Sequence, residues 1–206
     1  MQSTIRQLQA AAAPLLAIRP AQIQLMFPAT PPANIAANLT HVLAALTASG
    51  LTDPPMLLMA LATIRAETES FLPVAEAVSR FNTSPSGHPF DLYDHRADLG
   101  NQGPPDGASF RGRGFVQLTG RANYTRYAHE LSLDLVTHPE LACEPAIAAR
   151  LLAHFLAARQ TAIRHALAEN NLAAARRLIN GGSHGLDRFT DTYRTGETIF
   201  AKRIGC

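Results

Sequence analysis

The sequence lacks a long apolar run. No stretch of about 18 or more consecutive apolar residues occurs in it, which excludes a helix that crosses a membrane. It also lacks a good secretory signal, because Arg6 is followed by glutamines and the short apolar run 10–18 is interrupted by Pro14. We therefore expect no membrane insertion, and synthesis in the cytoplasm without a clear signal peptide.

Cysteine and charge are scarce as well. The two cysteines, Cys143 and Cys206, match no metal or redox spacing, and we interpret them as unpaired thiols while leaving a disulfide between them open. Charged residues make up 17% of the sequence and hydrophobic residues 47%, which excludes disorder for the bulk of the chain. A length of 206 residues fits one domain with a sizeable core.

The small net charge of +2 conceals an uneven distribution. Residues 51–100 carry three arginines against seven acids, whereas residues 151–206 carry eight basic residues against four acids. A basic region of this kind favours an anionic polymer, such as nucleic acid or cell wall, although it is also typical of a solvated helix face.

Apolar spacing predicts a mainly helical chain with a long irregular insert. The helices are expected over 21–26, 33–47, 54–71, 122–131, 145–165, 172–179 and 185–200. From Pro73 to Gly120 the periodicity disappears, and short strands are expected only around 115–119. An irregular stretch of this length inside a compact domain usually belongs to a binding site.

Glu67 and Glu76 lie on either side of Pro73, where this insert begins. Glu67 lies on or beside the buried stripe of its helix, whereas Glu69 lies about 200° further round the axis. A partly desolvated carboxyl suits a general acid. Glu76 follows nine residues on, beyond Pro73, and a chain that turns back there could hold it roughly 6.5 to 9.5 Å from Glu67, as an inverting glycosidase requires. A solvated glutamate at a frayed helix end is the alternative interpretation.

Four motifs in order carry a more specific signal. They are AETESF at 66–71, YDHRADLGN at 93–101, RGRGFVQLTGRANY at 111–124 and INGG at 179–182. With these motifs the sequence resembles glycoside hydrolase family 19, the chitinase-like enzymes, and especially their phage and prophage endolysins. The resemblance covers about residues 20–200.

The resemblance implies a role for particular residues. Glu67 matches the general acid, and Glu76 matches the general base as the short-loop endolysins place it. The residues that match substrate-binding positions, including those that hold the N-acetyl sugar or the attacking water, are Gln117, Thr119, Asn123, Tyr124, Asn180 and Arg188. Among them Arg188 is expected to contact the catalytic carboxylates. Glycines at 112 and 114 would let the backbone approach a polymer closely.

The sequence also departs from the family pattern. Ala66 stands where a histidine usually precedes the acid, and Ser183 and His184 stand where some chitinases carry a carboxylate. No tryptophan is present to stack on a sugar. The aromatic candidates near the motifs are Tyr93, Phe110, Phe115 and Tyr124.

The sequence gives only weak evidence for a metal site or a nucleic-acid-binding site. The residues His88, Asp91, Asp94 and His95 could suggest zinc, but their spacing fits no metal motif, and we interpret them as loop residues. Asp94 and Asp98 suit turns or caps. The two Arg-Gly units at 111–114 are embedded in apolar sequence and form no repeat, so we expect no nucleic-acid partner.

We therefore predict a lysozyme-like, mainly α, two-lobed domain over 1–206, with a long irregular region lining its cleft and at most a small β-hairpin. Its predicted activity is inverting hydrolysis of β-1,4 bonds between N-acetylated sugars of bacterial peptidoglycan, by a monomer that needs no metal or cofactor. A chitinase acting on chitin oligomers is the alternative, and a non-catalytic wall-binding module is the second. The sequence leaves open which bond is cut and whether the protein is a phage endolysin or a secreted bacterial effector.

Overall fold

The computed structural model describes residues 18–201. The described residues divide into two compact units: unit 1 comprises 18–72 and 152–201, and unit 2 comprises 73–151. Each unit is described by itself below. The expectation of one catalytic domain over 1–206 stays a prediction, and the expected signal features and Cys206 lie outside the described residues.

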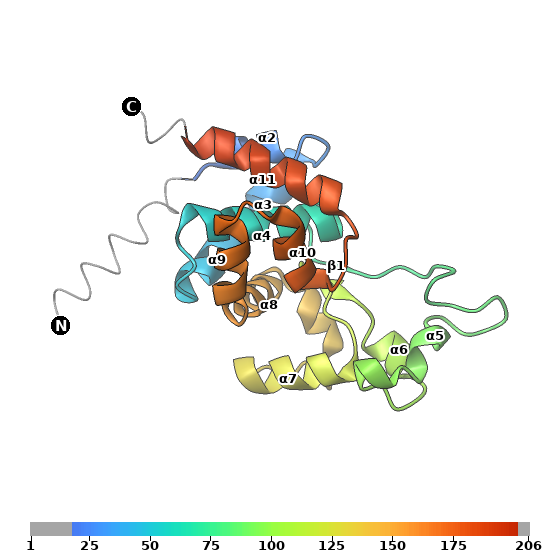
Figure 1. Ribbon diagram of the computed structural model, residues 1–206. Helices are drawn as coiled ribbons and strands as arrows, with labels where there is room; N and C mark the ends of the chain where they lie inside the picture. Colours follow the sequence, from blue (N-terminus) through green and yellow to red (C-terminus); the bar gives the residue numbers. More distant parts are fainter. Residues whose placement is uncertain (1–17, 202–206) are drawn as a thin grey trace, which may run out of the picture. The chain divides into compact units, whose positions relative to one another are not determined.

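Unit 1 is built from helices (Figure 1). Their bounds are α2 Pro20–Met26, α3 Pro32–Ala48, α4 Pro54–Thr68, α9 Gln160–Ala168, α10 Leu172–Asn180 and α11 Leu186–Ala201, together with the end of α8, Pro145–Ala157. Proline begins α2, α3 and α4, where its missing N–H costs no hydrogen bond. The carboxylate of Asp53 caps α4 by accepting from the Met56 N–H at 3.3 Å.

The core of unit 1 lies around α4. Every residue from Met56 to Ala66 is buried, as expected for a helix surrounded by other elements. Helix α11 packs against α4 and α2 (Figure 1). Gly196 allows this approach, because a Cβ atom there would lie only 2.3 Å from the Leu58 side chain. The helix that carries Glu67 is therefore fixed by apolar packing.

Unit 2 contains little regular structure before α7. Its elements are β1 Val74–Ala75, α5 Asp91–Asp94, the 3-10 turn η1 Ala97–Leu99, α6 Asp106–Ser109, β2 Arg113–Gly114, α7 Arg121–Leu131, the 3-10 turn η2 Pro139–Cys143 and the start of α8. Strands β1 and β2 pair antiparallel, with Val74 opposite Gly114. The buried Asp94 joins α5 to α6 by accepting from the Gly107 N–H at 2.8 Å.

The predicted fold class is confirmed: the described chain is mainly helical, with one two-stranded sheet. Two expectations were wrong in detail. The helix expected over 145–165 ends at Ala157 and a new one begins at Gln160, although neither proline nor glycine stands at the break. The strand expected at 115–119 lies at 113–114, with a single bridge from Arg113 to Leu118. None of the helices in the described part of the chain is long and apolar enough to cross a membrane.

Candidate active site

Glu67 lies in the last turn of α4, in unit 1. Its side chain is 13% exposed, whereas that of Glu69 is 47% exposed, so the two glutamates differ in burial as their helical spacing predicts. An oxygen of Glu67, Oε1, lies 2.7 Å from Nη2 of Arg176. Arg176 is fully buried on α10. A buried cation therefore fixes Oε1 of this carboxylate.

The INGG turn holds Arg176 in place. Its Nε and Nη2 groups both donate to the carbonyl oxygen of His184, at 3.1 and 3.0 Å. The side-chain amide of Asn180 donates to the same oxygen at 3.0 Å, while its own oxygen accepts from the Gly182 N–H. Asn180 thus belongs to the network that positions Arg176 and, through it, Glu67.

The arginine that contacts Glu67 differs from the one expected. Arg188 lies in α11 and pairs with Glu69, the residue that caps the end of α4, at 2.9 Å. Arg176 takes the place beside Glu67 instead. It stands four residues before Asn180, one helical turn away on the same face of α10.

Glu76 follows β1, in unit 2, and its carboxylate accepts three hydrogen bonds. Oε1 accepts from the amide of Asn82 and the hydroxyl of Tyr93, both at 2.9 Å. Oε2 accepts from the Gly112 N–H at 3.2 Å. Burial raises the pKa of Tyr93 to about 12, and the adjacent Glu76 carboxylate adds to this effect. Tyr93 therefore keeps its proton and remains a donor throughout the neutral range.

Three acceptor oxygens converge at Gly112. A Cβ atom placed on this residue would lie 2.8 Å from Gln117 Oε1, 3.2 Å from Glu76 Oε2 and 3.3 Å from Thr119 Oγ1. Gln117 uses its amide N–H groups on the carbonyls of Val74 and Gly114, each at 3.0 Å, so its oxygen stays an acceptor facing the cluster. Unit 2 thus brings together three of the residues singled out from the sequence.

The fold and part of the sequence match known proteins, although no family model matches. Chitinase C from Streptomyces griseus matches with a TM-score of 0.61 and 22% identity, covering 89% of this chain and 76% of that one; a mutant chitinase C matches with a TM-score of 0.62, 22% identity and the same coverage. This chain has the chitinase C fold.

A sequence relative agrees with the fold. A glycosyl hydrolase family 19 domain-containing protein from Haemophilus influenzae is 33% identical over 104 residues, which are 50% of this chain and 48% of that protein. The chain therefore spans about half the length of this curated relative. The resemblance to glycoside hydrolase family 19 is confirmed, in fold over most of the chain and in sequence over half of it.

Not every motif residue of this chitinase-like fold faces solvent. Tyr124 is fully buried, and its hydroxyl donates to the Arg111 carbonyl at 3.0 Å and accepts from Arg113 Nη1 at 3.0 Å. Phe110 and Phe115 are buried too. The expectation that these three rings stack on a sugar was wrong, because they form the core of unit 2 beneath the motif.

Asn123 and Thr119 lie at the start of α7. Asn123 is exposed, and its amide donates to the Thr119 carbonyl at 2.8 Å. The Thr119 hydroxyl donates to the Gln117 carbonyl at 2.8 Å. Each side chain thereby holds the backbone of the preceding motif residue. What they do to a substrate stays a prediction.

The histidines and aspartates before the motif stabilise loops of the chitinase-like fold. His88 pairs with the buried Asp94 at 3.1 Å, and Asp91 accepts from the hydroxyl and the N–H of Ser84. Within residues 18–201, no group of three or more His, Cys, Asp or Glu side chains is placed to hold a metal ion. Arg96 and Asp98 pair with each other at the surface.

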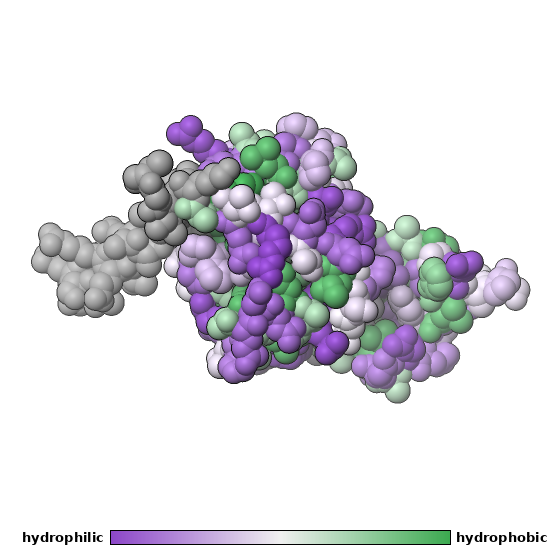
Figure 2. Space-filling model, turned by 45° about the horizontal axis from the view of Figure 1, so that its top comes forward, coloured by the Kyte–Doolittle hydropathy of each residue, from purple (hydrophilic) through white to green (hydrophobic). Residues whose placement is uncertain are grey.

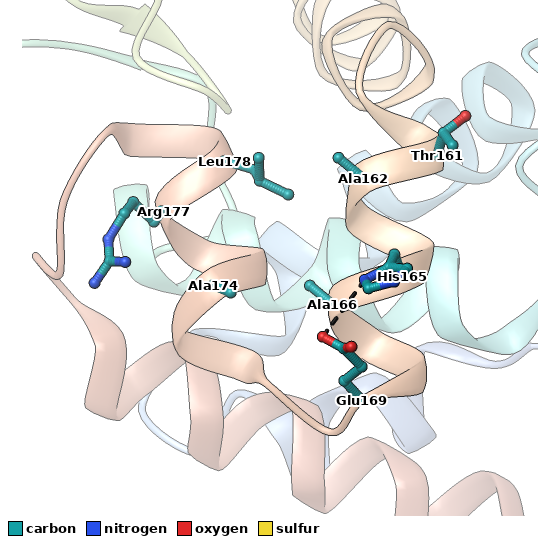
Figure 3. A pocket seen from close by; sticks show the side chains of 8 residues that line it. All are labelled: Thr161, Ala162, His165, Ala166, Glu169, Ala174, Arg177 and Leu178. Atoms are coloured by element: carbon teal, nitrogen blue, oxygen red, sulfur yellow. Dashed lines mark ion pairs between the residues drawn. The ribbon is translucent and has the colours of Figure 1, made fainter.

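A separate hollow of about 690 Å³ lies between α9 and α10 (Figure 3). It is lined by Thr161, Ala162, His165, Ala166, Glu169, Ala174, Arg177 and Leu178. Small alanine side chains leave the space, and His165 and Glu169 form an ion pair at 3.4 Å on one side of it. None of the residues singled out from the sequence lines this hollow.

Proposed function

We propose that this protein is an endolysin-type glycoside hydrolase that cleaves β-1,4 bonds between N-acetylated sugars of bacterial peptidoglycan. The observation that carries the proposal is the convergence of Glu76, Gln117 and Thr119 oxygens at Gly112. A water molecule can donate two protons, and one of its two lone pairs can attack a carbon. Three acceptors in one place suit a water held by its protons beside a carboxylate that can take one of them.

In the proposed mechanism, Glu76 accepts a proton from this water as its oxygen forms a bond to the anomeric carbon. Glu67 donates a proton to the glycosidic oxygen as its bond to the same carbon breaks. Since Arg176 contacts Oε1 of Glu67, the proton to be delivered belongs on Oε2. One water is consumed, the anomeric configuration inverts, and the two carboxyl groups exchange protonation states. The reaction needs neither metal nor cofactor.

Peptidoglycan is proposed over chitin on grounds of charge. Residues 151–206 carry eight basic residues against four acids, which suits the anionic bacterial wall, whereas chitin is uncharged. The YDHRADLGN motif and the compact chain also resemble endolysins. We further propose that the protein acts as a monomer and reaches the wall by release or export.

Product analysis tests this proposal. Wild type and Glu67→Gln would be incubated with purified peptidoglycan and, separately, with a chitin oligomer, and the soluble products identified by mass spectrometry. Glu69→Gln is a matched control, since this residue stands on the same helix end but is 47% exposed. We expect wild type and Glu69→Gln to release disaccharide-peptides, and Glu67→Gln to be slower by a factor of about 10² to 10⁴.

The products also distinguish the other functions. Reducing ends of N-acetylmuramic acid identify a muramidase, and those of N-acetylglucosamine identify a glucosaminidase. Cleavage of the chitin oligomer alone favours the second candidate, a chitinase, which the likeness to chitinase C supports. If neither polymer is cut, or if Glu67→Gln cuts as fast as wild type, the catalytic proposal fails and a non-catalytic wall-binding module takes its place.

A further inference from the structure

One aromatic side chain differs from all the others in exposure. All nine phenylalanines and four tyrosines lie within residues 18–201, and Phe81 is the only one of them in the exposed class, at 75%. Tyr93 is half-buried and uses its hydroxyl on Glu76. In this chain without tryptophan, the most exposed aromatic ring of the described residues therefore lies outside every motif found in the sequence.

The turn that carries Phe81 is wound around the side chain of Asn82. The Asn82 oxygen accepts from the Ser79 N–H at 2.8 Å and from the Thr83 hydroxyl at 2.9 Å. Its amide donates to the Ala77 carbonyl and to Glu76 Oε1, both at 2.9 Å. Since Asn82 is fully buried, this turn is anchored to the Glu76 carboxylate and holds Phe81 one residue away from that anchor.

Two exposed aliphatic residues lie close to Phe81 along the backbone, and one guanidinium covers part of its ring. Val78 is 57% exposed on the same turn, and Leu92, whose N–H donates to the Asn82 carbonyl at 3.3 Å, is 46% exposed. We name Val78, Phe81 and Leu92 the apolar rim. The guanidinium of Arg80 lies 4.8 Å from the centre of the Phe81 ring and covers part of one face. Figure 2 shows hydrophobic residues as scattered green areas on a largely hydrophilic surface.

We propose that the apolar rim binds a sugar ring of the peptidoglycan glycan strand, with Phe81 stacked against the ring's C–H face. The inference rests on the proposed function, because its occupant is a neighbour of the sugar attacked beside Glu76. A pyranose ring presents C–H groups on its faces and hydroxyls at its edges, so it fits an exposed aromatic ring flanked by aliphatic side chains. Continuity with the Glu76 anchor favours this occupant over an unrelated protein partner.

Binding and turnover measured on the same variants test the inference. The variants are Phe81→Ala, Phe81→Trp and, as the matched control, Leu25→Ala, which removes a 64% exposed apolar side chain from α2 in unit 1. Binding to insoluble peptidoglycan would be measured by co-sedimentation in the Glu67→Gln background, and KM and kcat on soluble glycan strands in the active enzyme. Thermal unfolding would confirm that each variant is folded.

We expect Phe81→Ala to weaken binding and raise KM by about 3- to 10-fold with little change in kcat, as for the loss of one aromatic stacking contact. Phe81→Trp should bind as well as wild type or better, and Leu25→Ala should behave as wild type. Equal binding by Phe81→Ala and wild type, on a polymer that the enzyme cuts, overturns the inference and leaves the proposed function intact. Failure to cut any polymer overturns the proposed function itself.

The same measurements with chitin oligomers identify which chemical group of the polymer the apolar rim binds. The N-acetylglucosamine ring occurs in both polymers, so a sugar contact predicts a similar loss on chitin oligomers and on peptidoglycan. A loss confined to peptidoglycan would assign the contact to its peptide stems and would overturn stacking on the sugar.

Discussion

The two proposed catalytic carboxylates are held by different kinds of structure. Glu67 stands on a helix whose residues from Met56 to Ala66 are all buried, and one buried guanidinium fixes its oxygen. Glu76 follows a two-residue strand in an irregular loop, and three hydrogen bonds fix its carboxylate. Apolar packing sets the first position and a polar network sets the second. Damage near Glu67 should therefore reduce stability, whereas damage near Glu76 should reduce activity.

The largest effect is expected when the polar network loses its charged centre. Glu76→Gln removes the proposed base while keeping the size of the side chain, so kcat should fall by a factor of about 10² to 10⁴, with the protein still folded. Turnover of peptidoglycan strands measures this. Asp98→Asn is the matched control in unit 2, since that carboxylate is 62% exposed and pairs with Arg96 at the surface. Unchanged turnover in Glu76→Gln would show that the loop carries no base.

Removing the buried cation beside Glu67 should affect stability most. Arg176→Met leaves a largely buried carboxylate without its partner and should lower the free energy of unfolding by about 3 kcal/mol. Urea denaturation measures the change. Arg188→Met removes the exposed partner of Glu69 and should cost less than about 1 kcal/mol. Adding Glu67→Gln to Arg176→Met should recover part of the loss; equal losses in both single arginine variants would contradict the comparison.

The same contrast explains what could be predicted from the sequence. Apolar spacing located α4 and the buried side on which Glu67 lies, because helix geometry translates spacing directly into burial. Between Pro73 and Gly120 no such rule applies, so the contacts of Glu76 with Asn82 and Tyr93 and the exposure of Phe81 were missed. These contacts and this exposure depend on how the loop packs against residues that are distant in the sequence.

The RGRGFVQLTGRANY motif indicated residues of the cluster at Gly112, but it did not indicate the distances between their atoms. A family motif contains core residues as well as site residues, so Tyr124 was expected to bind substrate although it is buried. The resemblance pointed to Arg188 and gave no sign of Arg176, because only the folded chain shows which guanidinium reaches which glutamate.

A pH-dependent ion pair tests whether charge also stabilises unit 2. The guanidinium of Arg121 lowers the pKa of the buried Asp106 carboxyl below its usual 3.8, with Nε 2.7 Å from Oδ2. A carboxyl with a lowered pKa in the folded state stabilises the fold above its unfolded pKa, and the contribution is lost as the pH falls through the folded value. Arg121→Gln should therefore cost about 1 to 3 kcal/mol at pH 7 and progressively less below about pH 4.

Arg126→Gln on the same helix supplies the control. Its partner Glu130 lies four residues on, and the arginine side chain is 50% exposed, so the expected cost is about 0.3 to 0.5 kcal/mol. Urea denaturation at pH 7 and at pH 3.5 measures both variants. A cost for Arg121→Gln that is the same at the two pH values would show that packing of this arginine, and not its charge, is what matters.

The smallest effect should come from removing one donor to Glu76. Tyr93→Phe deletes a single hydrogen bond at 2.9 Å, which should cost about 1 kcal/mol of stability and reduce kcat by about 3- to 10-fold. Tyr193→Phe on α11, in unit 1, is the control and should leave kcat unchanged. A merely structural role for Tyr93 would lower the amount of folded enzyme without changing kcat per folded molecule. A lower kcat per folded enzyme at unchanged KM is therefore the result that separates a residue positioning the base from one that only holds the loop.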